Sequence, residues 1–405
     1  MVELMKQNEC IQKILEEKNI KNYKIVSISE KKLVFKYSFG EISTEETKFD
    51  KMNVFFSTKK GTSKIILLST GTNDFIKKLI EDAIEKTNNN VFQTDVDFES
   101  SEIENKVYNE FNKNKYLKWL ESEVRKVSQN NKINLNFLYT INLSEYNLLI
   151  GKNPVKQYHT SSECVCFEDQ SFQKKLILNE VYLNDNLHEK ILKNFHLKNP
   201  VFAVKDFNSC ERVLIKAEAF AELLNIFVEL FYANNVYAYG TFKSSDINKQ
   251  IFKSSFDLVS LPYNGILFDS EGSKISEKFI IRNGRLLNLL SNNTYKRYLN
   301  INSSGNADLN EADKICCQRI KFVQKQEAKC PLNDADIIVK SFENIYLDFK
   351  ERLFVGLAVC SDKFKSKYLT AINFGIEKIF DKIYCVGESK WIKNIYCSDV
   401  LVCLK

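Results

Sequence analysis

The sequence is short of several residue types, and each shortage excludes a class of protein. Its 405 residues include only 12 glycines and 4 prolines beside 44% hydrophobic residues, which excludes collagen-like and disordered chains. The net charge is only +6 and the lysines are dispersed, so the charge pattern of a nucleic-acid-binding protein is missing. At about 150 residues per domain, we expect a globular protein of two to three domains.

Segments that direct a chain to a membrane or to secretion are also missing. The first residues lack the apolar core of a signal peptide, and the most apolar stretch, residues 220–233, is interrupted by Glu222, Asn225 and Glu229. The 11 cysteines are odd in number and irregularly spaced, which suits reduced thiols better than a disulfide framework. We therefore expect a cytoplasmic protein without a membrane partner.

Hydrophobic periodicity in the first half predicts a mixture of strands and helices. The clearest alternation covers residues 133–143 and predicts a long antiparallel strand, from which a meander continues to residue 167. Apolar residues three and four apart predict helices. We expect further strands at residues 33–39 and 64–68, helices at residues 2–17, 73–84 and 187–195, and one or two helices over residues 103–127.

The second half is predicted to be richer in strands. Pro200 favours a domain boundary near residue 200, because the residue before a proline is held away from the helical conformation. Asn283-Gly284 predicts a type I′ hairpin turn between two short strands. We also expect a helix over residues 218–231, a helix near residues 376–383 and a strand near residues 399–404.

Histidine is scarce, and His159, His188 and His196 do not form a zinc motif. On a helix, the eight residues between His188 and His196 separate them by roughly 80° around the axis and about 12 Å along it. Two imidazoles that share a zinc ion on one helix lie about four residues apart. We interpret both as ordinary helix residues, with a functional role as the alternative.

Two cysteine patterns allow a chemical and a structural interpretation. Cys164 and Cys166 lie near His159 in the sequence and could supply a thiol nucleophile with a base. Alternate residues of a strand point to the same face, however, so the pair is also typical of core packing. The adjacent Cys316 and Cys317 allow redox chemistry, but packing is the favoured interpretation.

The strongest polar cluster is the sequence Phe-Asp-Ser-Glu-Gly at residues 268–272. By itself it predicts a plain turn in which Asp269 caps, Glu271 is solvated and Gly272 adopts a positive φ. The sequence contains no glycine-rich phosphate loop, serine nucleophile elbow or dinucleotide fingerprint. The residues alone therefore indicate no self-sufficient catalytic site.

Several segments, taken in order, resemble the TldD/PmbA family and specifically its PmbA (TldE) branch. Residues 268–272, 281–286 and 304–307 resemble the family's acidic turn, its hairpin and its Thr-Gly-Asn/His-Ala signature, the last as Ser-Gly-Asn-Ala. Further similarity is found at residues 69–74, 236–251, 294–297 and 393–397. The order and spacing of these segments carry the resemblance.

The helix that holds zinc in catalytic members of this family differs here. Those members carry His-Glu-x-x-x-His, whereas residues 223–229 read Leu-Leu-Asn-Ile-Phe-Val-Glu and contain no imidazole. The degenerate zinc-helix positions are Leu224, Asn225, Val228 and Glu229. A Tyr-Ser-Arg-Gly region is also missing or shortened around residues 360–373. The resemblance therefore implies no catalytic residue, metal ligand or bound cofactor in this chain.

The resemblance implies an α+β fold, with an α/β N-terminal domain at residues 1–200 and a β-rich, barrel-like C-terminal domain at residues 201–405. It implies a heterodimer with a TldD-like zinc protease subunit, which binds unfolded peptides as extended strands. Such complexes act in leader-peptide removal, during maturation of ribosomally made peptide antibiotics, or in peptide degradation. The resemblance gives no reason to expect a nucleic-acid partner. The candidates for turns at the peptide channel are Asp269, Glu271, Gly272, Gly305 and Asn306.

Our first hypothesis is that the chain is a catalytically inactive subunit of such a metalloprotease, with zinc held by the partner. The alternative is a stand-alone peptide-binding or scaffold protein without protease activity, suggested by the shortened C-terminal region. A weaker alternative is a thiol hydrolase that uses Cys164 or Cys166 with His159.

Overall fold

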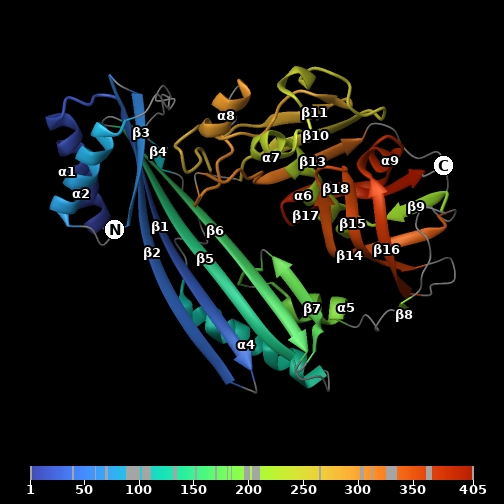
Figure 1. The fold of residues 1–405 in the computed structure, drawn as a ribbon. Helices are drawn as coiled ribbons and strands as arrows, with labels where there is room; N and C mark the ends of the chain where they lie inside the picture. Colours follow the sequence, from blue (N-terminus) through green and yellow to red (C-terminus); the bar gives the residue numbers. More distant parts are fainter. Residues whose placement is uncertain are drawn as a thin grey trace. The chain divides into compact units, whose positions relative to one another are not determined.

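The computed structural model divides the chain into two compact units, Met1–Lys198 (unit 1) and Asn199–Lys405 (unit 2) (Figure 1). The structure describes residues 2–38, 41–59, 61–68, 72–87, 101–102, 111–130, 135–150, 153–168, 171–179, 181–183, 185–195, 201–202, 210–263, 266–301, 305–311, 313–324, 335–361 and 367–403.

Unit 1 is built on a seven-stranded sheet in the order β3-β2-β1-β5-β6-β4, with β7 also paired to β6. Neighbouring strands are antiparallel, except that β4 pairs with β6 in parallel. The strands are β1 (Tyr23–Ser38), β2 (Glu41–Thr58), β3 (Gly61–Leu68), β4 (Ser101–Glu102), β5 (Leu135–Ile150), β6 (Asn153–Glu168) and β7 (Ser171–Asn179). The long strand and the meander predicted from residue 133 are thus confirmed as β5 and β6.

Four helices of unit 1 cover two separate hydrophobic cores on this sheet. Near one end, α1 (Val2–Glu17) and α2 (Asn73–Glu85) pack on β1, β2 and β3. Near the other, α4 (Lys113–Asn130) and α5 (Leu187–Phe195) pack on β1, β5 and β6. Thr72 caps the start of α2, because its side chain accepts a hydrogen bond from the Phe75 backbone N–H. Part of the helical segment expected at residues 103–127 lies outside the described residues.

Unit 2 contains an eleven-stranded sheet in the order β12-β11-β10-β13-β18-β9-β14-β15-β16-β8, with β17 also paired to β18. Among the described residues these strands form an open sheet, so the barrel-like closure expected for this domain is wrong, although the mixed helix and strand fold is confirmed. The strands are β8 (Val201–Phe202), β9 (Arg212–Ile215), β10 (Phe256–Leu261), β11 (Lys278–Arg282), β12 (Arg285–Leu286), β13 (Arg319–Gln324), β14 (Ile337–Asp348), β15 (Leu353–Ser361), β16 (Lys367–Gly375), β17 (Ile383–Ile392) and β18 (Ile395–Cys403).

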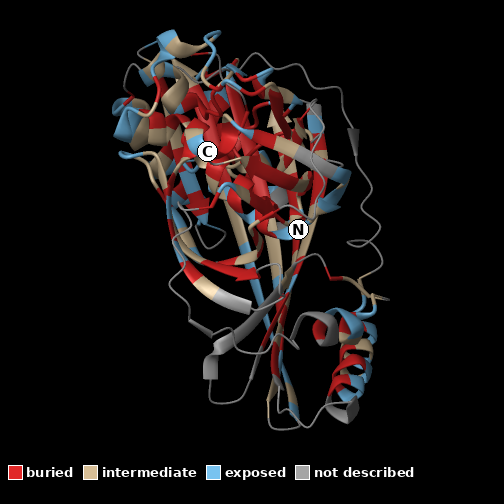
Figure 2. Cartoon of the chain, turned by 90° about the vertical axis from the view of Figure 1, so that its right-hand side faces the viewer, coloured by how far each residue is buried: buried red, intermediate tan, exposed pale blue. Residues whose placement is uncertain are grey.

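The core of unit 2 surrounds α6 (Ala217–Phe227), which lies against β14 and β18. This helix is apolar around most of its circumference, as a helix enclosed by other elements should be. Phe227 stacks on Phe380 with ring centroids 3.8 Å apart. Buried residues concentrate inside the unit (Figure 2). Among the described residues, five shorter helices complete it: η2 (Val228–Phe231), α7 (Ala233–Tyr239), η3 (Ser244–Asp246), α8 (Asn293–Leu299) and α9 (Ile376–Phe380).

The predicted hairpin turn is present between β11 and β12. Asn283 and Gly284 have φ values of 51° and 76°, the positive values that a type I′ turn requires at both central positions. Gly284 is also required by space, because a Cβ there would lie 2.5 Å from the Ser254 carbonyl oxygen. Among the described residues, the helices are too short or too polar to cross a lipid bilayer.

Candidate functional site

The acidic turn predicted at residues 268–272 is buried, and Asp269 organises it. Asp269 is 1% exposed, and its Oδ1 accepts hydrogen bonds from the backbone N–H groups of Glu271 at 3.0 Å and Ser273 at 2.9 Å. Its Oδ2 accepts a third, from the Ala307 N–H at 3.0 Å. Gly272 has a φ of 66°, as the turn prediction required. Three backbone N–H groups therefore donate to this carboxylate, which joins two distant segments of the chain.

Glu271 is also buried, so the expectation that it is solvated is wrong. Its side chain is 1% exposed, and its Oε2 accepts a hydrogen bond from the Asn293 N–H at 2.8 Å. Asn293 is the first residue of α8, where backbone N–H groups lack partners within the helix. Asn292 caps the same end by accepting from the Tyr295 N–H. Glu271 therefore fixes the start of α8.

Gly305 and Asn306 lie against the same turn. Gly305 has a φ of 62°, and a Cβ added to it would lie 2.3 Å from the Lys274 carbonyl oxygen, so a larger residue does not fit. The Asn306 N–H donates to the Ser291 carbonyl oxygen at 3.2 Å. Its buried side-chain Oδ1 accepts no hydrogen bond from the described residues. The second predicted turn therefore packs backbone to backbone against the first.

Cys316 and Cys317 extend this network toward the end of η2. The Cys316 N–H donates to the Asn306 carbonyl oxygen at 2.9 Å, and the Cys317 N–H donates to the Tyr232 hydroxyl at 3.1 Å. Burial raises the pKa of each thiol to about 12. Both thiols stay protonated near neutral pH and are poor nucleophiles. This geometry agrees with the packing interpretation of the pair.

Lys278, which the sequence analysis overlooked, brings a cation to this region. Burial lowers its pKa to about 8, against the opposing influence of Asp269 and Cys317. Lys278 pairs with Ser260 across β10 and β11 and has the same strand parity as the buried Ile280. Alternate residues of a strand point to the same face, so the alternation along β11 would have placed Lys278 on the same buried side as Ile280.

We name Asp269, Glu271, Gly272, Gly305 and Asn306 the turn cluster. The structure thus brings together the five residues that were predicted separately as turn candidates. Because these hydrogen bonds join the two turns to each other and to α8, the cluster is suited to holding segments in place. It acts as a rigid support for α8.

The degenerate zinc-helix positions lie at the junction of α6 and η2. Leu224 and Val228 are 0% and 1% exposed and belong to the core of unit 2, whereas Asn225 is exposed. Glu229 is partly buried, and burial raises its pKa. One carboxylate and two core aliphatic residues do not fit the ligand set of a zinc ion. Among the described residues, no three His, Cys, Asp or Glu side chains lie close enough to share a metal ion.

The histidine and thiol candidates of unit 1 are not brought together. Cys164 and Cys166 are buried in the core beneath α4 and α5, with their sulfurs 3.7 Å apart. Their mutual hydrogen bond, with burial, raises the pKa of Cys166 far above its ordinary value. His159 lies on the same strand with opposite parity to Cys164 and therefore on the other face of the sheet, about 16 Å away along the strand. The structure thus offers no thiol–imidazole pair here.

His188 has a structural environment on α5. Its Nδ1 lies 2.7 Å from Glu123 Oε2, and its backbone N–H donates to the same oxygen at 2.9 Å. Burial raises the pKa of Glu123, but hydrogen bonds from Lys126 and His188 outweigh it and hold that pKa below its ordinary value. These contacts fasten α5 to α4. His196 lies outside the described residues.

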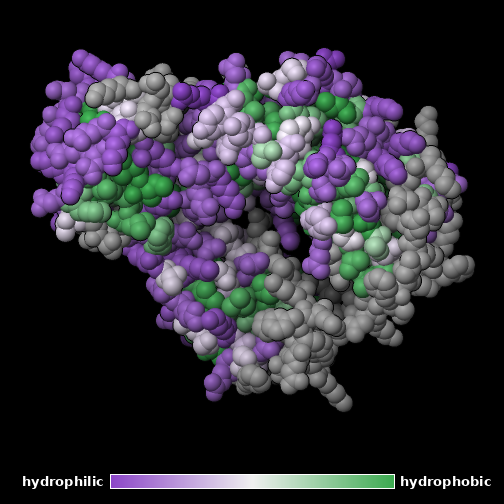
Figure 3. All heavy atoms as spheres, viewed as in Figure 1, coloured by the Kyte–Doolittle hydropathy of each residue, from purple (hydrophilic) through white to green (hydrophobic). Residues whose placement is uncertain are grey.

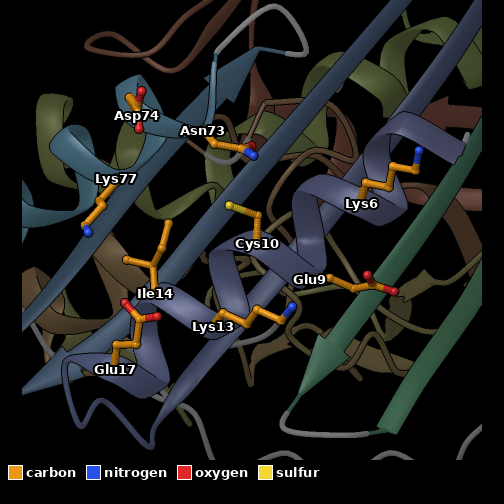
Figure 4. A pocket seen from close by; sticks show the side chains of 9 residues that line it. All are labelled: Lys6, Glu9, Cys10, Lys13, Ile14, Glu17, Asn73, Asp74 and Lys77. Atoms are coloured by element: carbon orange, nitrogen blue, oxygen red, sulfur yellow. The ribbon is translucent and has the colours of Figure 1, made fainter.

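An open groove runs between α1 and α2 of unit 1 (Figure 4). Its volume is about 410 Å³. None of the predicted site residues lines it, and its charged side chains, three of each sign, balance one another, so the groove favours no ligand by charge. It is lined by Lys6, Glu9, Cys10, Lys13, Ile14, Glu17, Asn73, Asp74 and Lys77.

Comparison with known proteins gives a family-model match for part of unit 2. Residues 209–330 match the model of the PmbA/TldA metallopeptidase C-terminal domain. The turn cluster, α6, α7 and α8 all lie inside this matched segment. Comparison with curated proteins gives no match.

Solved structures of low sequence identity share the fold over nearly the whole chain. A protein described as a modulator of DNA gyrase from Thermotoga maritima superimposes with a TM-score of 0.75 at 13% identity, over 99% of both chains. TldE from Thermococcus kodakarensis superimposes with a TM-score of 0.75 at 13% identity, over 97% of this chain and 98% of that one. A second protein described as a modulator of DNA gyrase, from Bacteroides thetaiotaomicron, superimposes with a TM-score of 0.72 at 9% identity, over 98% of this chain and 97% of that one. Residues 209–330 therefore match a PmbA/TldA metallopeptidase C-terminal domain, and the chain as a whole has the fold of these solved structures.

Proposed function

We propose that this chain is the non-catalytic, TldE-like subunit of a cytoplasmic heteromeric zinc metalloprotease that cleaves unfolded peptides. The observation that carries the proposal is the composition of the α6–η2 junction. Leu224 and Val228 are part of the unit 2 core, and Glu229 is the single ionisable group among the four positions where catalytic relatives would hold zinc. A hydrolytic centre then has to come from another subunit. The similarity in fold to TldE from Thermococcus kodakarensis supports the same assignment.

The turn cluster supports a role in assembly over a role in chemistry. Its two carboxylates accept hydrogen bonds from four backbone N–H groups, and the thiols beside it have a pKa raised by burial to about 12. Such groups stabilise a surface that a partner or peptide can contact. The nine described cysteines are free thiols, which suits the reducing compartment that we propose.

The experiment compares the chain alone with the chain co-expressed with a TldD-type subunit that carries His-Glu-x-x-x-His. We expect the lone chain to bind no stoichiometric zinc and to leave an unfolded, fluorescently labelled casein intact. The co-purified complex should contain zinc and cleave the casein until a chelator is added. Glu229→Ala should leave the zinc content of the complex unchanged, whereas replacing the histidines of the partner should abolish it.

Two outcomes would redirect the proposal. Chelator-sensitive cleavage by the lone chain would overturn it, since the chain would then hold its own metal centre. Recovery of the chain only with itself and a bound peptide would favour the stand-alone peptide-binding or scaffold alternative. Leader peptides of modified-peptide gene clusters are the substrates to examine once the complex is active.

A further inference from the structure

The side chain of Lys278 lies beside neutral polar groups in unit 2. Lys278 begins β11 and pairs with Ser260 of β10, and directly opposite residues of paired antiparallel strands point to the same face. Ser260 is 3% exposed, and its Oγ lies 3.3 Å from the Cys317 sulfur, so this face of the two strands is turned toward the interior. Lys278 itself is half-buried on that face.

The amine of Lys278 has no counterion in contact with it. The part of the chain that the structure describes offers this amine no hydrogen-bond acceptor. Asp269 is the carboxylate that acts on Lys278, but its oxygens accept from the backbone N–H groups of Glu271, Ser273 and Ala307. The carboxylate nearest in influence is therefore engaged in holding the two turns together.

Other lysines of the chain show what a direct counterion does. The Nζ of Lys18 lies 2.8 Å from Glu81 and the Nζ of Lys390 lies 2.8 Å from Glu218, and each hydrogen bond raises the pKa of the amine. For Lys278, burial instead lowers the pKa to about 8. At pH 7.5 about a quarter of such amines are neutral, against about one in a thousand at the ordinary value of 10.5. A neutral amine has the lone pair that a nucleophile needs.

The surroundings favour reaction at this amine over reaction at the neighbouring thiols. Burial raises the pKa of Cys316 and Cys317 to about 12, so both stay protonated near neutral pH. Hydrophobic side chains reach the surface among hydrophilic ones near β10 and β11 (Figure 3), and Lys278 is half-buried, which suits a small uncharged reagent. An amide is neutral, so acylation would remove a charge that is unfavourable to bury.

We propose that Lys278 is a site of covalent acylation by small thioesters. The amine nitrogen attacks the carbonyl carbon of the thioester, a C–N bond forms and the C–S bond breaks. The proton that leaves the nitrogen reaches the departing thiolate through water, which gives an amide and a free thiol. The step requires only the amine and the thioester, so the inference goes beyond the proposed function and does not depend on it.

The test treats the full chain at pH 7.5 with S-acetyl-N-acetylcysteamine, a small uncharged thioester. The chain is then unfolded, its remaining amines are labelled with deuterated acetic anhydride, and mass spectrometry of the peptides gives the extent of the first reaction at each lysine. We expect Lys278 to react at least about tenfold faster than Lys274, an exposed lysine four residues earlier, because far more of the Lys278 amine is neutral.

Two further measurements connect this reactivity to the fold. The rate at Lys278 should level off above about pH 8, where its amine is already mostly neutral, whereas the rate at Lys274 should keep rising to about pH 10. In urea, which unfolds the chain, the two lysines should react at similar rates, because the burial of Lys278 is lost.

Each contrary result would overturn the inference. Equal rates at Lys278 and Lys274 in the folded chain would show that the amine has no special reactivity. A preference for Lys278 that persists in urea would show that the local sequence causes it and the fold does not. A rate at Lys278 that rises with pH in parallel with that of Lys274 would show that its amine is protonated like an exposed one.

Discussion

Asp269→Ala tests whether the turn cluster supports the fold of unit 2. The substitution leaves the N–H groups of Glu271, Ser273 and Ala307 without their acceptor in a buried environment. A buried donor that loses its partner costs about 1–3 kcal/mol, so three of them should lower the free energy of unfolding by about 3–5 kcal/mol after some relaxation. Asp269→Asn keeps one acceptor oxygen, so its free energy of unfolding should lie between those of Asp269→Ala and the wild type.

Asp348→Ala is the matched control, because Asp348 accepts from the backbone N–H groups of Lys350 and Glu351, at 3.0 Å each, but in an exposed turn. Water replaces the lost acceptor there, so we expect a loss below about 1 kcal/mol. In a Trp119→Phe background, Trp391 is the remaining tryptophan of the two and reports urea unfolding of unit 2. Equal losses for both alanine variants would refute the reasoning that burial makes Asp269 important.

Further substitutions test neighbouring features of unit 2. Gly305→Ala should lower the free energy of unfolding by more than about 2 kcal/mol, because it combines a φ of 62° with a Cβ 2.3 Å from a backbone oxygen. The control is Gly240→Ala, where φ is 66° and no atom lies within 4 Å of the added Cβ. In the same urea titration, this control should lower the free energy of unfolding by about 1 kcal/mol. A similar loss in both would show that the segment at Gly305 can move. Lys278 has a pKa of about 8 in the folded protein and an ordinary value of 10.5, so between these pH values the unfolded chain binds more protons and stability rises with pH. Between pH 7.5 and pH 10, the free energy of unfolding of the wild type should therefore rise by about 2 kcal/mol relative to that of Lys278→Met. If the difference between the two proteins does not change with pH, the amine of Lys278 is not buried.

Local patterns predicted the elements whose causes are local. Strand β5 has a strict alternation, Thr72 caps α2 across three residues, and Asn283-Gly284 forms the hairpin turn between adjacent strands. In each case the interacting residues lie within a few positions of one another. Period and turn chemistry therefore suffice to identify them.

The predictions that were wrong depend on contacts between distant segments. Glu271 is buried because its partner Asn293, 22 residues further along, supplies an N–H that needs an acceptor. Its solvation could not be judged from the turn alone. Whether the sheet of unit 2 closes into a barrel likewise depends on how eleven strands pair, including parallel neighbours such as β9 and β14. The resemblance gave these residues as candidates for two turns, but that the two turns lie together, and through which hydrogen bonds, required the tertiary structure.

The sheet of unit 1 has a consequence of its own, because one strand serves two cores. Tyr23 and Ile25 of β1 pack under α1 and α2, whereas Leu33 and Phe35 pack under α4 and α5. Each helix pair closes a different end of the same strands, so either pair can detach while the other stays docked. We therefore expect two places of local opening in unit 1, which amide hydrogen exchange should reveal as separately protected ends of one continuous ladder.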